Sequence, residues 1–240
     1  MKRKAIMSLT PELVALCERS VADPGPEPGG LEMSEAEIHE AAGRLDRECA
    51  DRPLWLFAYG SLIWKPAFDH IETRRANAAG WHRSFCMTMH RWRGSAEQPG
   101  LMMAIMRGGT CHGVAYRLSD ENRTEQIYRM IWRETSYSED LESVRWIDVD
   151  TDAGKVRALT FWAAPKGSYI VKKMAPEEAA RRIARACGHI GSNAAYLYNT
   201  VSKLAEFGIR DRNLWHLQEL VAAEIRVMAG QMQSVAEVSV

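Results

Sequence analysis

The chain has 240 residues, 46% of them hydrophobic and 26% charged, a composition typical of a globular protein with enough apolar residues for a full core. Its 31 basic and 31 acidic side chains give a formal net charge of zero. A nucleic-acid or anionic-membrane partner needs a basic excess, so we expect neither. No apolar run approaches the ~20 residues of a membrane span.

The cysteines and the N-terminus indicate a cytoplasmic protein. The start, Met1 to Lys4, is basic like a signal peptide, but Thr10-Pro11-Glu12 interrupts any apolar segment, so we expect no cleaved leader. The five cysteines are scattered, without a Cys-x-x-Cys pair, which favours reduced thiols in the cytoplasm. The seven histidines show no metal-like spacing, so we predict no metal site.

The first 52 residues are predicted to be a helical extension. Thr10 and Pro11 have the residue types of a helix cap and first helical position. A Pro/Gly-rich linker follows over residues 23–30, and a second helix begins where Ser34 and Glu37 have capping-box spacing. The main domain is predicted over residues 53–230, with a C-terminal tail over 231–240.

The main domain is predicted to begin with a buried strand that ends in a tight turn. Leu54 to Tyr59 is an unbroken apolar run, typical of a strand buried on both faces. Gly60 permits a turn closed to other residues, and Ser61 can form local hydrogen bonds. Such a turn points successive backbone N–H groups outward and can bind a carboxylate or an oxyanion. An ordinary core strand with an ordinary turn is the alternative.

The remaining pattern favours an α+β fold. Residues 79–89 alternate like a strand, and residues 102–106 and 112–118 are predicted as two strands joined by a hairpin at Gly108-Gly109. A helix over about 120–137, a strand over 157–163 and three helical segments from Pro176 onward follow. Strands, then a helix, a strand and a helical tail do not form a doubly wound sheet.

Glu134 is the candidate acid–base residue. It lies seven residues after Ile127 and three after Ile131, so the three share one helix face. Burial on that apolar face would raise the pKa of the Glu134 carboxyl and make it a useful base near neutral pH. A Glu near a helix end that reaches solvent, or that pairs with Arg133 or Arg129, is the more ordinary interpretation of these residues alone.

Several segments together resemble one enzyme family. They are residues 54–64 (LWLFAYGSLIW), 80–86 (GWHRSFC), 98–100 (QPG), 113–118 (GVAYRL), the pair Arg133-Glu134 and residues 191–197 (GSNAAYL). In this order and spacing they are similar to the ChaC-type γ-glutamylcyclotransferases over roughly residues 54–225. The chain departs from that family at Leu101, where the family has Arg, and over residues 135–140, so the exact γ-glutamyl substrate is left open.

The resemblance implies a fold, a site and a reaction. The fold would be a γ-glutamylcyclotransferase-like mixed sheet or small barrel with flanking helices, in a catalytic domain over residues 53–230. Glu134 would be the catalytic residue, and the substrate would contact Tyr196 and the loop Ala58, Tyr59, Gly60, Ser61 and Leu62. The reaction would convert glutathione to 5-oxoproline and Cys-Gly without a cofactor, because the α-amine of the substrate is the nucleophile.

Two alternatives remain at this point. The enzyme could act on other γ-glutamyl peptides or amines. A non-catalytic binding or regulatory protein could also keep the same fold, and relatives of this kind have been described as cation-transport regulators. A base on an apolar helix face is of no use to a mere binding protein, so the pair of the Tyr-Gly-Ser loop and Glu134 favours the enzyme.

Overall fold

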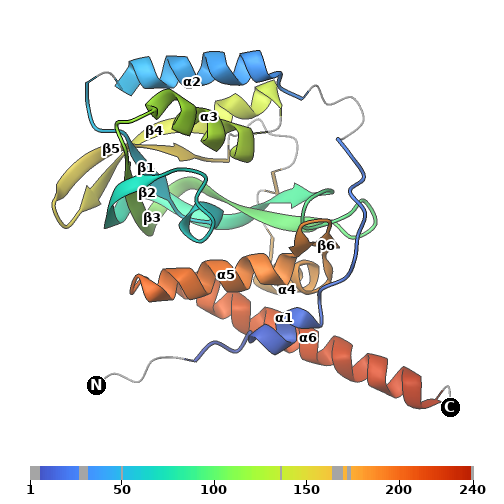
Figure 1. Cartoon of the computed structure of the whole chain (residues 1–240). Helices are drawn as coiled ribbons and strands as arrows, with labels where there is room; N and C mark the ends of the chain where they lie inside the picture. The colour runs from blue at the N-terminus through green and yellow to red at the C-terminus, as the bar shows by residue number, and fades with distance from the viewer. Residues whose placement is uncertain are drawn as a thin grey trace. The chain divides into compact units, whose positions relative to one another are not determined.

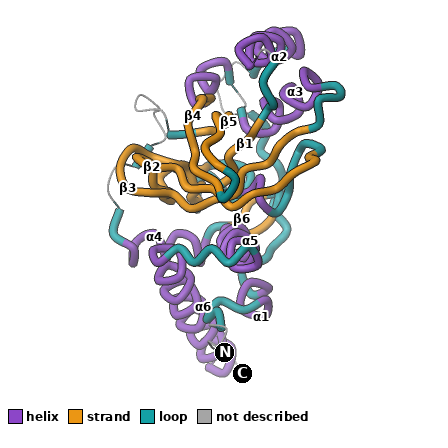
Figure 2. Tube along the Cα trace, turned by 90° about the vertical axis from the view of Figure 1, so that its left-hand side faces the viewer, coloured by secondary structure: helices purple, strands orange, loops and turns teal. Residues whose placement is uncertain are grey.

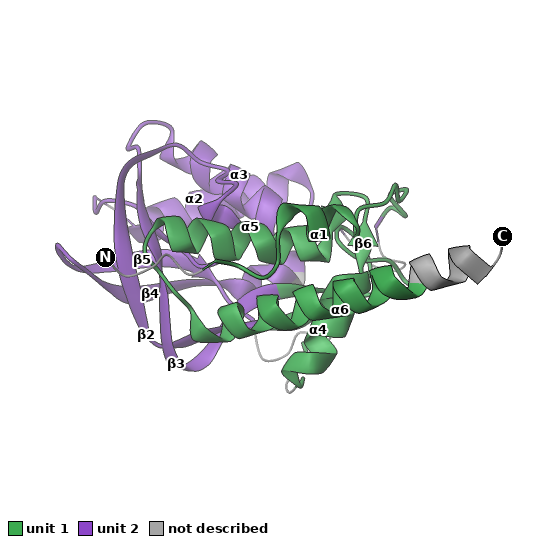
Figure 3. Cartoon of the chain, turned by 90° about the horizontal axis from the view of Figure 1, so that it is seen from below, with its two compact units in different colours: residues 1–25, 85–102, 168–240 green, residues 26–84, 103–167 purple. Residues whose placement is uncertain are grey.

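A computed structural model describes residues 6–26, 32–49, 51–135, 137–163, 170–171 and 174–238, except for the side chains of Glu139 and of residues 232–238. The chain forms two compact units that are interleaved along the sequence (Figure 3). Unit 1 comprises residues 1–25, 85–102 and 168–240, and unit 2 comprises residues 26–84 and 103–167.

The sheet is a closed barrel with the strand order β1-β3-β2-β4-β5. Its strands are β1 (Trp55–Ala58), β2 (His70–Met89), β3 (Gly100–Leu118), β4 (Val144–Thr151) and β5 (Gly154–Phe161). The long strands β2 and β3 run from unit 2 into unit 1. A closed barrel leaves no unpaired edge, which a short strand such as β1 would otherwise expose.

Strand β1 lies between two partners. It pairs antiparallel with β3, where Phe57 is opposite Ala115, and parallel with β5, where Leu56 is beside Leu159. All four β1 residues are buried, as the unbroken apolar run predicts. Residues at alternate positions of the strands, such as Phe57, Ile147 and Ala158, form the apolar core of the barrel.

Two helices of unit 2 lie side by side over the barrel strands (Figure 1). They are α2 (Glu35–Cys49) and α3 (Arg123–Glu134). Helix α2 begins at the predicted capping box, in which the Ser34 N–H donates to Glu37 at 2.8 Å and the Glu37 N–H donates to the Ser34 hydroxyl at 3.3 Å. Arg123 of α3 forms an ion pair with Asp46 of α2 and joins the two helices.

Unit 1 is mainly helical, with α1 (Pro11–Ala15), α4 (Pro176–Arg185), α5 (Asn193–Glu206) and α6 (Arg212–Val238). Helices α4 and α5 pack on α6, and α1 contacts α5 and α6 (Figure 2). The short strands β6 (Cys187–Gly188) and β7 (Gly191–Ser192) pair between α4 and α5. As predicted, Thr10 caps α1, where its hydroxyl accepts from the Leu13 N–H.

The structure confirms the α+β barrel with flanking helices and corrects two details. The predicted hairpin at Gly108-Gly109 is wrong, because β3 continues through both glycines as one strand. Their φ values of +105° and +71° bend the strand without reversing the chain. Strand β4, which precedes the predicted strand near residue 157, was not expected from the sequence. It pairs antiparallel with β5, with Val144 opposite Phe161 at one end and Thr151 opposite Gly154 at the other.

The domain boundaries at residues 52 and 230 stay a prediction. Residues 6–25 belong to unit 1 and residues 32–49 to unit 2, while parts of the predicted extension and tail, such as 1–5, 27–31 and 239–240, lie outside the described residues. Within the described part of the chain, no helix is long and apolar enough to cross a membrane.

A buried amide should stabilise unit 1 strongly. The Asn193 side chain, 0% exposed, accepts from the Leu101 N–H and donates to the Leu101 carbonyl, both at 2.7 Å. Asn193→Ala leaves both Leu101 groups without these partners, so we expect a loss of about 2–4 kcal/mol in the free energy of unfolding, measured by urea denaturation. The matched change Asn213→Ala, at an exposed position of α6, should cost under about 0.5 kcal/mol. Equal effects would contradict this.

Candidate active site

The loop after β1 is fixed by hydrogen bonds on both sides of its turn. A short 3₁₀ helix, η1 (Ser61–Ile63), follows the strand directly. The Ile63 N–H donates to the Gly60 carbonyl at 3.0 Å, and the Lys65 N–H donates to the Ser61 carbonyl at 2.8 Å. Gly60 has φ −136° and ψ −128°, so the turn is made without a left-handed residue. The loop is therefore held rigidly where the buried strand ends.

Three successive backbone donors of this loop have no partner in the described part of the chain. Among the described residues, no atom accepts a hydrogen bond from the N–H of Gly60, Ser61 or Leu62. Gly60 and Leu62 are buried, whereas Ser61 is half-buried. Backbone N–H groups in such a turn can stabilise a carboxylate or a developing oxyanion. The loop can therefore serve as the predicted oxyanion cradle.

A buried arginine, Arg83, supports the loop from the barrel side. Its side chain comes from β2 and is 5% exposed. Its guanidinium donates to the carbonyl of Tyr59 at 3.2 Å and to the carbonyl of His112. Sequence reasoning assigned Arg83 no role. Its signal was its position between the buried Trp81 and Phe85 on an alternating strand, where a charged side chain needs a partner.

Glu134 occupies the last residue of α3. The helix buries Ile127, Met130 and Ile131 completely, as the predicted apolar face requires. The Glu134 side chain is only 18% exposed, and its carboxylate lies 3.2 Å from Nε of Arg133. Burial raises the pKa of the Glu134 carboxyl, and the charge of Arg133 opposes this by a smaller amount. A carboxyl with a raised pKa can both take and return a proton near neutral pH.

Arg133 has a donor left over beside this carboxyl. Its side chain is 21% exposed, and its Nη1 atom is buried with no hydrogen-bond partner among the described residues. A buried, unpartnered guanidinium N–H is costly, and a planar guanidinium binds carboxylates particularly well. Arg133 is thus suited to hold an anionic group of a ligand next to Glu134.

Tyr196 lies in unit 1, whereas Glu134 and the loop from Ala58 to Leu62 lie in unit 2. The Tyr196 side chain, on α5, is 6% exposed. Its ring meets the ring of Phe85 edge-on, with centroids 5.8 Å apart, and the Arg93 guanidinium carbon lies 5.7 Å from its ring centre. Its assignment as a substrate contact stays a prediction.

The start of α5 is fixed by a residue from the N-terminal segment. The Ser192 hydroxyl caps α5 by accepting from the Ala195 N–H at 3.1 Å. It also donates to the Glu18 carboxylate at 2.7 Å, and the Ser192 N–H donates to the same carboxylate at 3.0 Å. The sequence did not reveal this contact, because Glu18 lies 174 residues away.

The described residues hold no group of three or more His, Cys, Asp or Glu side chains arranged as metal ligands. That the site works without a metal or a cofactor stays a prediction. The chemistry that the geometry supports needs a base, a set of oxyanion donors and an anion anchor. Glu134, the loop N–H groups and Arg133 have the properties for these three tasks.

The fold is that of the γ-glutamylcyclotransferases. A crystal structure of the glutathione-specific γ-glutamyl cyclotransferase from yeast superposes on this chain with a TM-score of 0.64, covering 71% of this chain and 96% of the yeast chain at 19% identity. At that identity the likeness shows the fold alone. The barrel and its flanking helices are therefore shared with that enzyme.

The sequence places the chain more narrowly. The family model for ChaC-like proteins matches residues 54–224, so the chain belongs to the ChaC-like family. The glutathione-specific gamma-glutamylcyclotransferase of Escherichia coli is 36% identical over 163 residues, 68% of this chain and 70% of that protein. Glutathione-specific gamma-glutamylcyclotransferase 1 of Homo sapiens is 31% identical over 158 residues, 64% of this chain and 69% of that protein.

Burial of Glu134 should appear as a pH-dependent cost in stability. Because its pKa is raised in the folded state, the folded chain binds this proton more tightly than the unfolded chain. Ionisation therefore lowers stability as pH rises from the unfolded pKa of about 4.3 through the raised folded pKa. Glu134→Gln cannot ionise, so its stability relative to wild type should increase over this range, measured by urea denaturation at several pH values. A difference that stays constant with pH would contradict the raised pKa.

Proposed function

We propose that this protein is a γ-glutamylcyclotransferase that converts glutathione to 5-oxoproline and Cys-Gly, with Glu134 as general acid and base. The observation that carries the proposal is the buried Glu134 carboxyl with its raised pKa. Membership of the ChaC-like family and the names of its relatives in Escherichia coli and Homo sapiens support the substrate.

The proposed reaction uses a nucleophile that the substrate brings with it. The α-amine of the γ-glutamyl group attacks its own γ-carbonyl, a new C–N bond closes the five-membered ring, and the bond to the cysteine nitrogen breaks. Glu134 takes the proton that the attacking amine loses and returns it to the leaving nitrogen. No redox step or metal is needed, because one proton moves and one acyl bond replaces another.

The loop and Arg133 supply the rest of this mechanism. The N–H groups of Gly60, Ser61 and Leu62 stabilise the negative charge on the γ-carbonyl oxygen as the amine attacks. Arg133 holds the α-carboxylate of the γ-glutamyl group, which is bonded to the same carbon as the reacting amine. This contact brings the amine to Glu134 and favours the folded conformer that closes the ring, an orientation effect on the order of 7–11 kcal/mol at best.

The substrate and the compartment complete the proposal. Tyr196 and the residues Ala58 and Tyr59 are included as substrate contacts, because they match the family's motifs. All five cysteines are buried thiols that form no disulfide with one another, which supports a reducing compartment, and we place the protein in the cytoplasm. The partner is then a small γ-glutamyl peptide, with no nucleic acid or membrane involved.

The test is a substrate panel. Purified protein is incubated with glutathione, γ-glutamylcysteine and γ-glutamyl amines, and 5-oxoproline is measured by chromatography. We expect 5-oxoproline from glutathione in preference to the others. Release of 5-oxoproline from γ-glutamyl amines but not from glutathione would show that γ-glutamyl amines are the substrates instead. Tight binding of glutathione without 5-oxoproline would show a binding protein on this fold instead of an enzyme.

Glu134→Gln should remove nearly all turnover, because the variant keeps the size of the side chain but cannot carry the proton. We expect a loss of about 10²–10⁴-fold in kcat with little change in the affinity for glutathione, measured by 5-oxoproline release and calorimetry. Glu125→Gln is the matched control, since Glu125 lies on the same helix, half exposed, and pairs with Arg129. More than a tenth of the wild-type rate in Glu134→Gln would show that the base lies elsewhere.

The pH profile should move when Arg133 is changed. Glu134 must be ionised to act as a base, so kcat/KM falls on the acid side as its raised pKa is crossed. Arg133 lowers this pKa, so Arg133→Gln should shift the acid limb to higher pH and raise KM as well.

The substrate amine contributes its own acid-side dependence, which a γ-glutamyl substrate with an altered amine pKa identifies. If the acid limb follows the amine completely, and Arg133→Gln leaves it in place, Glu134 does not control the profile.

A further inference from the structure

Two arginines of the barrel stack on the same two tryptophans. The guanidinium carbon of Arg107, on β3, lies 4.2 Å from the Trp81 ring centre and 5.9 Å from the Trp162 ring centre. The guanidinium carbon of Arg145, on β4, lies 5.8 Å and 5.1 Å from the same two centres. The two indole rings meet edge-on at 5.6 Å. Both guanidinium groups therefore lie within 6 Å of the same two ring centres.

Neither arginine forms an ion pair with a carboxylate among the described residues. Glu142, three residues before Arg145, contributes only its backbone oxygen, which accepts from the Trp162 indole N–H at 3.1 Å. Stacking occupies the flat faces of the guanidinium groups and leaves their in-plane N–H donors available. Two positive charges that share the same pair of rings repel each other, and an anion that both can reach reduces this repulsion.

This cluster shares an end of the barrel with the Tyr59 loop. Strands β1 and β5 run parallel, so Tyr59 after β1 and Trp162 after β5 leave the barrel at the same end. Both side chains pack against the barrel core that contains Trp81. Arg145 is the register partner of Thr160, whose hydroxyl donates to the Phe57 carbonyl at 2.9 Å, one strand away. Trp162, which both arginines contact, and the loop therefore lie at the same end of the barrel.

We propose that Arg107 and Arg145 bind the C-terminal carboxylate of the peptide that leaves when the ring closes. This inference rests on the proposed function, because it assigns the second end of the same substrate. The dipeptide after the γ-carbonyl spans at most about 7 Å, so its carboxylate stays near the end of the barrel where the loop lies. The arginine pair makes the enzyme prefer γ-glutamyl peptides with a free C-terminal carboxylate over γ-glutamyl amines.

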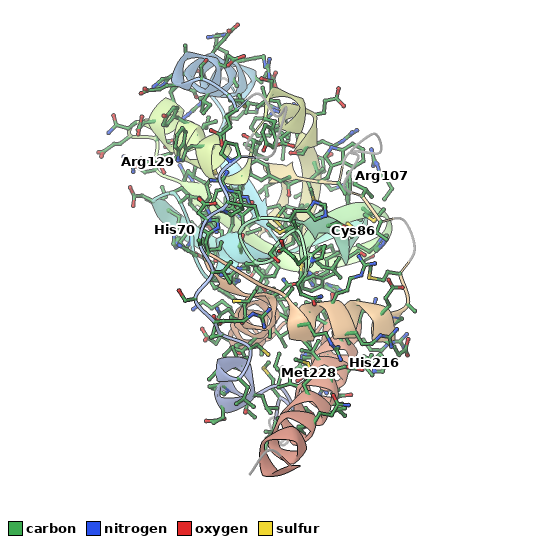
Figure 4. All side chains as sticks on the ribbon, turned by 90° about the vertical axis from the view of Figure 1, so that its right-hand side faces the viewer. His70, Cys86, Arg107, Arg129, His216 and Met228 are labelled. Carbon is green, nitrogen blue, oxygen red and sulfur yellow. The ribbon has the colours of Figure 1, made fainter. Side chains whose placement is uncertain are left out.

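The experiment compares glutathione with its C-terminal amide, which lacks only the negative charge. Wild type, Arg107→Gln, Arg145→Gln and the double variant are assayed for 5-oxoproline with both substrates. Arg157→Gln is the matched control. Arg157 lies on β5, and its guanidinium carbon is 5.3 Å from the ring centre of a different tryptophan, Trp146, so it is not part of the cluster. Arg129→Gln is a second control, since Figure 4 shows Arg129 and Arg107 on opposite sides of unit 2.

We expect wild type to prefer glutathione over the amide by about 10- to 100-fold in kcat/KM, the effect of a charged hydrogen bond. Arg107→Gln and Arg145→Gln should each raise KM for glutathione about tenfold and leave the amide's constants nearly unchanged, so that the double variant loses the preference. If the stack were purely structural, the substitutions would lower kcat/KM equally for glutathione and its amide, and that result would overturn the proposal. Equal kcat/KM values for the two substrates in wild type would also overturn it.

Binding by calorimetry to Glu134→Gln separates this inference from the proposed function. Turnover without carboxylate dependence would leave the function standing and overturn the arginine site. If binding depends on the carboxylate and is lost in Arg107→Gln, but wild type shows no turnover, the arginine site would stand and the proposed function would be overturned. Inorganic phosphate is included as a probe: binding of phosphate to the pair, with glutathione and its amide bound equally, would show an anion site unconnected with the substrate and would also overturn the proposal.

Discussion

The parallel pairing of β1 with β5 is the constraint on which the site depends. β1 is only four residues long, and it is stable because β3 and β5 bind it on both sides within a closed barrel. The contact with β3 is so close that a Cβ at Gly113 would lie 2.5 Å from the Ala58 carbonyl oxygen. The Thr160 hydroxyl binds the Phe57 carbonyl on the other side. The loop that follows β1 therefore starts from a fixed position, and its N–H groups need no reorganisation to meet a negative charge.

The charged residues of the candidate site are buried to different degrees. Arg83 is almost completely buried and donates to the carbonyls of Tyr59 and His112, so it supports the loop. Arg133 keeps a buried donor unpaired beside Glu134, whose pKa burial raises. An unpaired buried donor and a buried carboxyl both lower stability. Such costs are tolerated at functional sites, where a ligand can compensate for them.

The sequence predicted the parts of this structure that depend on local patterns. The cap at Thr10, the capping box at Ser34 and the apolar face shared by Ile131 and Glu134 each depend on residues within one or two helical turns, and the structure confirms them. The hairpin at Gly108-Gly109 was wrong, because positive φ values bend a strand as readily as they reverse it, and only long-range pairing decides. Strand β4, the role of Arg83 and the shared stack of Arg107 and Arg145 also depend on long-range contacts, so the sequence alone did not predict them.

The segment before residue 25 shows how far such long-range contacts reach. Glu18 accepts from the N–H and the hydroxyl of Ser192, and so places a negative charge at the positive end of α5. Gly191, which precedes Ser192, has φ +112°, a conformation that residues other than glycine rarely adopt. The Leu9 N–H donates to the buried Gln218 of α6 at 2.8 Å and ties the same segment to a second helix. Residues of the predicted N-terminal extension therefore help to fix the helix that carries Tyr196, because a carboxylate at the start of this helix satisfies donors that the helix itself leaves unpaired.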